Sequence, residues 1–305
     1  MANQSEIEAV YDWVDHFHTL RLGAYADFTC AYFNGDFSKT LDQAQKNKHA
    51  WILKGVSFQA GQRILDIGCG WGNMLQAVRL RDGMGLGLTL SSAQTQYGQA
   101  HGLDVRLQDW KTVDRNRLGK FDGVVSIGAF EHFCSIEEFE AGQQEKIYDD
   151  FFRLCADVLP DGGRLYLQTM IWGHKVPDPK TLKPDAPEGS VERSLARMLK
   201  FYPGSWLPQG KHQIVDMAAK YFYFLESSNG RLDYIETLKR WDASTRNLYH
   251  PKRFWRALIG AFRLVPRYLS DPDFRVQIES VKKKDQQVCF EREIITHERL
   301  FFQKK

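Results

Sequence analysis

Short apolar runs alternate with helical patterns along the middle of the chain. The run at 63–68 contains Ile64, Leu65 and Ile67 and ends in a glycine-rich turn. A short apolar run that ends in a turn signal is typical of a strand buried on both faces. Strands that alternate with helices form a mostly parallel sheet with helices on both faces. We therefore predict an α/β fold whose further strands are 84–90, 105–108, 121–127 and 163–171.

The segments outside this alternating region follow other patterns. Residues 137–159 are amphipathic with a helical period and stop at the turn signal Pro160–Gly163. Residues 172–210 break the alternation, because they hold six of the ten prolines of the chain. We interpret them as an insertion that caps the open end of the sheet, with a domain linker as the alternative. Further helices are predicted at 6–22, 39–54, 191–201, 212–224, 232–249 and 252–269, and a final pair of strands within 288–302.

The composition of the chain argues against some classes of function and indicates a cell compartment. The net charge of +3 over 305 residues argues against a dedicated nucleic-acid-binding protein. The one dense basic run, Lys282–Lys284, is expected to be a solvated loop or helix end. The first residues lack the features of a signal peptide, and no apolar stretch is long enough to span a membrane. The five cysteines form no Cys-x-x-Cys pair, which favours free thiols in a reducing cytosol over disulfides or a zinc site. We expect a cytoplasmic protein without a metal site.

A glycine-rich loop follows the first predicted strand and opens a helix. Its residues are Leu65-Asp-Ile-Gly-Cys-Gly-Trp-Gly72, with glycines at alternate positions. This spacing differs from the Gly-x-Gly-x-x-Gly of a dinucleotide site, and no Gly-Lys-Ser/Thr follows as in a P-loop. Such glycines let the backbone turn tightly and approach a ligand closely. Because the first strand-to-helix turn of an α/β sheet is a usual place for a ligand, we predict a binding site here rather than a merely structural turn.

Other motifs accompany this loop along the chain. They are Phe28–Phe33, Thr40–Gln45, Gly87–Ser91 with Gln94, Val125–Phe133, Phe201–Pro208 and Tyr234–Trp241. Together with the loop they resemble the cyclopropane fatty acid and mycolic acid cyclopropane synthase family. The resemblance implies a Rossmann-like class I methyltransferase with a mostly parallel seven-stranded sheet and a cap insertion. It also implies S-adenosylmethionine as the methyl donor. The chain lacks the long N-terminal extension of the fatty acid branch, so its length is closer to that of the mycolic acid branch.

The resemblance implies a donor pocket whose residues can be named position by position. Thr89 and Gln94 would hydrogen-bond the ribose in place of the acidic residue that many methyltransferases use. Trp110 would offer a face to the adenine with Asp109 as acceptor for its amino group, although core packing is an alternative role for Trp110. The full set is Phe28, Thr29, Gly68, Gly70, Gly72, Thr89, Gln94, Asp109, Trp110 and Ile127.

The resemblance also implies the reaction. An alkene takes the methyl group and becomes a carbocation, which aromatic faces in a dry cavity stabilise. A base then removes a proton from the new methyl group, and the family holds a bicarbonate ion for this step with Cys, Glu, His and Tyr side chains. Cys30, Glu131 and Tyr234 match three of these positions, whereas Gln168 stands at the position of the His. An amide has no titratable proton, so the match to a bicarbonate site is incomplete. The structural alternatives are a small buried hydrophobe for Cys30, an ion-pair partner for Glu131, packing for Tyr234 and a neighbour of the site for His132.

These observations lead to a ranked set of functions. We expect a methyltransferase that acts on an alkene carbon of a lipid or lipid-like acceptor. The alternatives are an N- or C-methyltransferase of a small secondary metabolite and a non-catalytic S-adenosylmethionine-binding protein. Residues 1–305 would form a single domain, with N-terminal helices within 1–55 over the donor site and an acceptor-binding cap at 172–250. Some aromatic residues of the cap are expected to line an apolar acceptor cavity that reaches Gly128. A membrane surface or an acyl carrier protein would present the acceptor.

Overall fold

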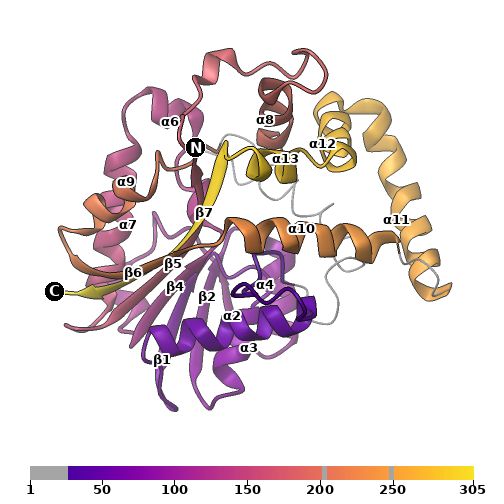
Figure 1. Cartoon of the computed structure of the whole chain (residues 1–305). Helices are drawn as coiled ribbons and strands as arrows, with labels where there is room; N and C mark the ends of the chain where they lie inside the picture. The colour runs from indigo at the N-terminus through magenta and orange to yellow at the C-terminus, as the bar shows by residue number, and fades with distance from the viewer. Residues whose placement is uncertain (1–26, 201–204, 247–250) are drawn as a thin grey trace.

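The computed structural model describes residues 27–200, 205–246 and 251–305 of the chain. These residues form a seven-stranded sheet with the strand order β3-β2-β1-β4-β5-β7-β6 (Figure 1). Strands β1 to β5 are parallel to one another, whereas β7 is antiparallel to both β5 and β6. The strands are β1 (Arg63–Ile67), β2 (Met84–Thr89), β3 (Asp104–Leu107), β4 (Gly123–Ile127), β5 (Arg164–Trp172), β6 (Phe222–Asn229) and β7 (Ile295–Lys304). The predicted α/β fold with a mostly parallel sheet is confirmed, and its five predicted strands are β1 to β5.

Helices connect the strands and cover the sheet. They are α2 (Leu41–Gly55), α3 (Asn73–Arg79), α4 (Ser92–Ala100), α5 (Arg115–Leu118), α6 (Ile136–Glu140), α7 (Gln144–Val158), α8 (Val191–Leu199), α9 (Lys211–Ala218), α10 (Arg231–Arg246), α11 (Pro251–Ser270), α12 (Pro272–Lys283) and α13 (Asp285–Glu291), with the short 3-10 helices η2 (Phe130–His132) and η3 (Pro179–Thr181). The helices predicted at 39–54, 191–201, 232–249 and 252–269 are confirmed as α2, α8, α10 and α11 within the described residues. The helix predicted at 6–22 lies outside them.

The two faces of the sheet pack against different helices, because successive residues of a strand point to opposite faces. Ile64 and Val125 lie in one apolar cluster with residues of α2 and α3. Leu65 and Val124 lie in another cluster with residues of α7 and α9. Strand β5 lies between β4 and β7 and is buried over nearly all of its length. The sheet is therefore a doubly wound layer with its core on both sides (Figure 1).

Two predictions near the C-terminal edge of the sheet are wrong. The helix predicted for 212–224 ends at Ala218, and Phe222–Phe224 belong to β6 instead. The strand pair predicted within 288–302 is one strand, β7, which follows α13. Strand β7 inserts between β5 and β6, so its partners lie far from it in sequence. Local apolar patterns do not reveal such pairing, because strand formation depends on the neighbouring strands.

The amphipathic segment at 137–159 is divided into two helices. Gly142 has a φ of +70° and separates α6 from α7. Helix α6 begins with a capping box, in which the side chains of Ser135 and Glu138 each accept a hydrogen bond from the other's backbone N–H. Helices α12 and α13 were not predicted, although the expectation for Lys282–Lys284 is confirmed because these residues end α12.

The proline-rich segment 172–210 leaves the end of β5 and returns to it. The backbone N–H of Trp172 donates to the carbonyl oxygen of Pro208 at 2.9 Å. The indole rings of Trp172 and Trp206 lie 4.8 Å apart in an apolar cluster that also contains residues of α8, α10 and α13. Buried Arg197 of α8 forms two hydrogen bonds with Asp285 of α13, at 2.7 and 2.9 Å. The segment thus packs over the end of β5 together with the C-terminal helices. No helix within the described residues is long and apolar enough to cross a membrane.

Candidate active site

The glycine-rich turn between β1 and α3 has the backbone conformation that its sequence predicts. Gly68, Gly70 and Gly72 have φ angles of +85°, +52° and +79°, in the region that favours glycine. A Cβ atom on Gly68 would lie 2.2 Å from the Cβ of Ala129, so the turn also approaches the end of β4 closely. Gly72 is the N-cap residue of α3. The turn therefore needs glycine at these three positions, because residues with a side chain rarely adopt such backbone angles.

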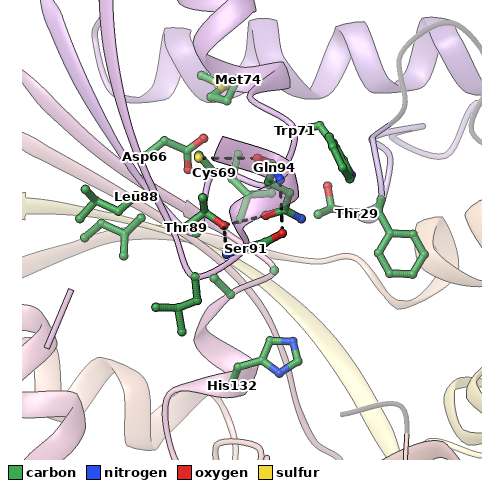
Figure 2. A pocket seen from close by; sticks show the side chains of 18 of the residues that line it. Thr29, Asp66, Cys69, Trp71, Met74, Leu88, Thr89, Ser91, Gln94 and His132 are labelled. Carbon is green, nitrogen blue, oxygen red and sulfur yellow. Dashed lines mark hydrogen bonds between the residues drawn. The ribbon is translucent and has the colours of Figure 1, made fainter. Parts of the chain in front are cut away.

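A pocket lies beside this turn, at the carboxyl ends of β1, β2 and β4, where doubly wound sheets bind their ligands. Figure 2 shows Thr29 and Trp71 on one side of the pocket, Asp66 and Thr89 on the other, and His132 below. Nine of the ten predicted donor residues line it, and Gly72 does not. The nine are Phe28, Thr29, Gly68, Gly70, Thr89, Gln94, Asp109, Trp110 and Ile127. Residues far apart in the sequence are thus brought together as expected.

Polar side chains at the end of β2 and directly after it form hydrogen bonds with one another. The Thr89 hydroxyl donates to Oε1 of Gln94 at 2.6 Å. The Ser91 hydroxyl accepts from the backbone N–H of Gln94 at 3.3 Å and so caps α4. Thr89 and Gln94 are both buried and both line the pocket. A buried hydroxyl and amide in fixed orientation can pair with the hydroxyl groups of a sugar.

Trp110 lines the pocket and also packs in the core beneath it. Its ring lies 4.9 Å from that of Phe133 and 5.6 Å from that of Phe151. Asp109 precedes it, and one of its carboxylate oxygens accepts from the backbone N–H of Lys111 at 2.9 Å. The two roles considered for Trp110, a wall of the site and core packing, are therefore compatible.

A buried ion cluster, which the sequence analysis missed, holds one wall of the pocket. The carboxylate of Asp27 accepts from Lys48 at 2.8 Å and from the Thr29 hydroxyl at 2.7 Å, and it lies 2.9 Å from Nε2 of His49. Burial alone would raise the pKa of Asp27, but the positive charge of Lys48 and the hydrogen bond with His49 hold that pKa below its ordinary value. Asp27 is therefore ionised, and the cluster fixes Thr29 against the pocket.

Asp66 is a second residue that the sequence analysis did not assign. It lines the pocket at the end of β1, and its Oδ1 has no hydrogen-bond partner among the described residues. Burial, reinforced by the negative charge of Asp27, raises the pKa of Asp66 to about 8. The available signal was a carboxylate in a strand that is apolar after Arg63, since a buried carboxylate is costly unless it has a ligand or a partner.

Glu131 lies on η2, directly after β4, and lines the same pocket. Its Oε1 accepts from the backbone N–H of Met170 at 2.9 Å, whereas its buried Oε2 has no partner among the described residues. Burial raises the pKa of Glu131 to about 7, although the hydrogen bond from Met170 opposes this effect. A carboxyl group with such a pKa can take up a proton near neutral pH.

Two neighbours of Glu131 complete this end of the pocket. Nδ1 of His132 lies 2.9 Å from the hydroxyl of Ser205, and burial lowers the pKa of His132 to about 4. Tyr234, in the first turn of α10, contributes an aromatic ring that packs 4.6 Å from Phe290. Both residues line the pocket. His132 is therefore neutral at neutral pH, and α10 reaches the site through Tyr234.

Cys30 and Gln168 do not line the pocket, in contrast to Glu131 and Tyr234. The sulfur of Cys30 accepts from Arg299 at 3.3 Å, and burial raises the pKa of this thiol to about 11. The amide of Gln168 donates to the carbonyl oxygen of Cys30 at 3.4 Å and accepts from the hydroxyl of Tyr166 at 2.9 Å. Of the four residues assigned to the base site, Cys30 and Gln168 contact each other, and only Glu131 and Tyr234 line the pocket.

Comparison with known proteins identifies the family of this chain. The sequence profile of the family described as mycolic acid cyclopropane synthetase matches residues 1–255. Cyclopropane mycolic acid synthase 2 of Mycobacterium leprae is 36% identical over 260 residues, which cover 78% of this chain and 79% of that protein. The S-adenosylmethionine-dependent methyltransferase UmaA of Mycobacterium tuberculosis is 32% identical over 259 residues, 80% of each protein. The crystal structure of mycolic acid cyclopropane synthase CmaA1 complexed with SAH and CTAB has a TM-score of 0.75 and 27% identity, and the match covers 99% of this chain and 98% of that chain. The chain belongs to the mycolic acid cyclopropane synthetase family of S-adenosylmethionine-dependent methyltransferases.

Proposed function

We propose that this chain transfers a methyl group from S-adenosylmethionine to an alkene carbon of a lipid or lipid-like acceptor. The observation that carries the proposal is the position of Glu131, a buried carboxyl group in the same pocket as the glycine-rich turn. The names of the curated relatives support a lipid alkene as the acceptor. The methyl donor and the acceptor would then bind in the same pocket.

The donor is proposed to lie along the glycine-rich turn. The backbone at Gly68 and Gly70 is open to a close approach, because neither residue has a side chain there. Thr89 and Gln94 would bind the ribose, and Trp110 would contact the adenine. When bound, the donor supplies a methyl group on a sulfonium centre. The residues of the chain orient it and keep water away.

Aromatic rings surround the end of the pocket where the acceptor would react. Phe28 lines the pocket and stacks on Trp241 at 5.0 Å, and the ring of Tyr234 is also part of the lining. When the methyl carbon bonds to one alkene carbon, its bond to sulfur breaks and the other alkene carbon becomes positive. The faces of aromatic rings stabilise such a charge. Phe28 and Tyr234 are therefore proposed to stabilise the cationic acceptor until it loses a proton, and Trp241 supports the ring of Phe28.

Glu131 is proposed to accept that proton. Removal from the new methyl group closes a cyclopropane ring, whereas removal from a neighbouring carbon leaves an alkene next to a methyl branch. If the acceptor were a heteroatom of a small metabolite, Glu131 could take its proton directly. All three outcomes need an ionised Glu131, which its pKa of about 7 permits at neutral pH.

We propose that bicarbonate is held weakly here. Both polar ends of the Gln168 amide are engaged, one by Tyr166 and one by the backbone of Cys30, and the sulfur of Cys30 is engaged by Arg299. A small buried anion that loses one hydrogen bond loses about 1–3 kcal/mol of binding free energy. Added bicarbonate should therefore change the rate less than in a synthase that has the full Cys, Glu, His and Tyr set. A strongly bicarbonate-dependent reaction with a cyclopropane as its main product would contradict this.

The remaining proposals concern the acceptor-binding region of the chain and its cell compartment. We propose that 172–250 forms the acceptor-binding cap, which is supported by the part of Tyr234 in the pocket and by the return of the segment to the end of β5. A cytoplasmic location is supported by the five cysteines, which are all free thiols.

The test uses S-adenosylmethionine with a labelled methyl group. Lipid and aqueous metabolite extracts are incubated with the wild type, with Glu131→Gln, and with Glu140→Gln as a control on an exposed carboxylate. Label in the lipid fraction that depends on Glu131 but not on Glu140 supports the proposal. Label in a small amine or other aqueous metabolite shows that the acceptor class is wrong.

A further inference from the structure

Arg299 is a buried cation that does not itself line the pocket. It lies on β7, directly opposite Gln168 of β5. Its Nη2 lies 2.8 Å from Oδ2 of Asp233, in the first turn of α10, and donates to the carbonyl oxygen of Ala31 at 2.9 Å. A buried charge is costly unless it is paired and hydrogen-bonded. Here the partners come from distant parts of the chain, so Arg299 connects β7, α10 and the segment around residue 31.

Residues 28–31, which we call the 28–31 segment, are bound at their carboxyl end by two side chains of the sheet. The carbonyl oxygen of Cys30 accepts from the amide of Gln168 at 3.4 Å. The next carbonyl oxygen, that of Ala31, accepts from Arg299. Because Gln168 and Arg299 are cross-strand neighbours, two adjacent positions of the sheet bind two consecutive carbonyl groups.

Helix α10 binds the same segment. The hydroxyl of Thr237 accepts from the backbone N–H of Ala31 at 3.1 Å and donates to the carbonyl oxygen of Asp233 at 2.7 Å. One helical turn later, the ring of Trp241 stacks on that of Phe28 at 5.0 Å. Both backbone polar groups of Ala31 are therefore bound, one by α10 and the other by Arg299.

Gly230 allows the start of α10 to approach the guanidinium group closely. A Cβ atom on Gly230 would lie 2.8 Å from Cζ of Arg299 and 2.4 Å from Nδ1 of His297. The backbone N–H of Gly230 donates to the carbonyl oxygen of His297 at 2.8 Å, so α10 begins directly beside β7 (Figure 1). This close contact brings Asp233 to Arg299.

The amino end of the 28–31 segment has separate anchors. Nε2 of Gln45 donates to the carbonyl oxygen of Thr29 at 2.9 Å, and Lys48 donates to the Thr29 hydroxyl. Both anchors belong to α2. Loss of Arg299 should therefore release the end of the segment at Ala31 and leave Thr29 in place beside the proposed donor site.

We propose that Arg299 is a positioning residue for methyl transfer, which fixes the 28–31 segment and the start of α10 relative to each other. Phe28 and Tyr234, which line the pocket, belong to these two elements and would thereby keep their places around the acceptor. The inference rests on the proposed function, because both rings are assigned there to the cationic acceptor. A planar guanidinium group suits this role, since it can bind two acceptors in a fixed arrangement.

The experiment measures transfer of a labelled methyl group from S-adenosylmethionine to a lipid extract. Arg299→Lys keeps the charge beside Asp233 but lacks the planar fork that also binds Ala31. Thr237→Val keeps the shape of the side chain and removes the acceptor for the Ala31 N–H. A displacement of about 1 Å in groups that orient reactants can cost about 10²-fold in rate, so kcat should fall by up to this factor in Arg299→Lys. It should fall less in Thr237→Val, and both variants should keep the wild-type KM for S-adenosylmethionine.

The matched control is Lys304→Gln, which removes another cation of β7. Lys304 donates to the carbonyl oxygen of Leu159 at 2.8 Å and does not line the pocket. This variant should keep the wild-type kcat. A double-mutant cycle of Arg299→Lys with Phe28→Leu tests whether Arg299 acts through that ring. If it does, the loss of kcat in the double variant should be smaller than the product of the two single losses.

Hydrogen exchange gives a measurement that needs no acceptor. The backbone amides of the 28–31 segment should exchange faster in Arg299→Lys than in the wild type. Three results would overturn the proposal: a wild-type kcat in Arg299→Lys, independent losses in the double-mutant cycle, or unchanged exchange in the segment. An equal loss of kcat in Lys304→Gln would also overturn it, because the effect would then not be specific to Arg299. Absence of label in the lipid fraction of the wild type would count against the proposed function, while the exchange rates would still decide whether Arg299 fixes the segment.

Discussion

Replacement of Glu131 by Gln tests the central residue of the proposed site. Gln keeps the shape of the side chain and can still accept the hydrogen bond from the backbone N–H of Met170. It cannot take up a proton, so turnover should fall by about 10²- to 10⁴-fold. Donor binding should stay nearly unchanged, because the groups assigned to the donor are left intact. In the wild type, the rate should rise with pH through about 7 as the carboxylate forms.

The same substitution should change stability in a pH-dependent way. The pKa of Glu131 is about 7 in the folded protein, against an ordinary value of 4.5. Because the native state binds the proton more tightly, wild-type stability falls as pH rises from 4.5 to about 7 and stays lowered above that range. At about 1.4 kcal/mol for each pH unit, the loss amounts to about 3 kcal/mol. Gln does not ionise, so the variant should gain up to this amount relative to the wild type as pH rises.

The assay is urea denaturation of both proteins below pH 4.5 and above pH 7. Glu140→Gln, at an exposed carboxylate, serves as the control. Its free energy of unfolding should stay close to that of the wild type at both pH values. A structural ion pair at Glu131 would give the opposite result, because its loss would destabilise the protein most at high pH. An inactive variant that is also less stable at high pH would refute the assignment of Glu131 as a buried base whose Oε2 has no partner among the described residues.

Three further predictions concern the donor side of the pocket. Lys48→Met leaves the charge of Asp27 buried without its cation and should cost about 3–5 kcal/mol in urea denaturation, whereas Lys54→Met on the exposed side of the same helix should cost little. Gly68→Ala should reduce the affinity for S-adenosylhomocysteine, measured by calorimetry, more than Gly70→Ala does, because only the Cβ atom added at position 68 meets a neighbouring atom. Equal losses of affinity in the two variants would show that backbone conformation alone matters. S-adenosylhomocysteine at about 100 times its Kd should stabilise the native protein by about 2.7 kcal/mol, and folded protein that shows no shift in Tm would contradict donor binding.

Much of the site follows from local sequence. The glycines at 68, 70 and 72 are needed because the turn there has positive φ angles, and that requirement is visible in the spacing alone. Thr89 lies near the end of one predicted strand and Glu131 follows another, and the carboxyl ends of parallel strands meet at one edge of the sheet. Their convergence on the pocket could therefore be predicted without coordinates. Asp66 could have been found in the same way, as a carboxylate within a buried strand.

The pairings between distant segments could not be predicted. Asp27 and Lys48, or Arg197 and Asp285, have no local pattern that marks them as partners, although each pair is buried and in direct contact. The same holds for the helix wrongly predicted at 212–224, whose last residues become a strand only because β7 lies beside them. In each case the partner that decides the structure comes from another part of the chain.

The sequence by itself determined the alternation of strands and helices from β1 to β5, the glycine-rich turn and the identity of the groups that could bind a donor. These follow from periodicity and backbone sterics, which act within a few residues. The tertiary structure decided which of those groups face the pocket. It turns Glu131 and Tyr234 toward the pocket and leaves Cys30 and Gln168 outside it, hydrogen-bonded to other residues. It also raises the pKa of Glu131, because burial depends on what packs around a carboxyl group and not on the residues next to it in the chain.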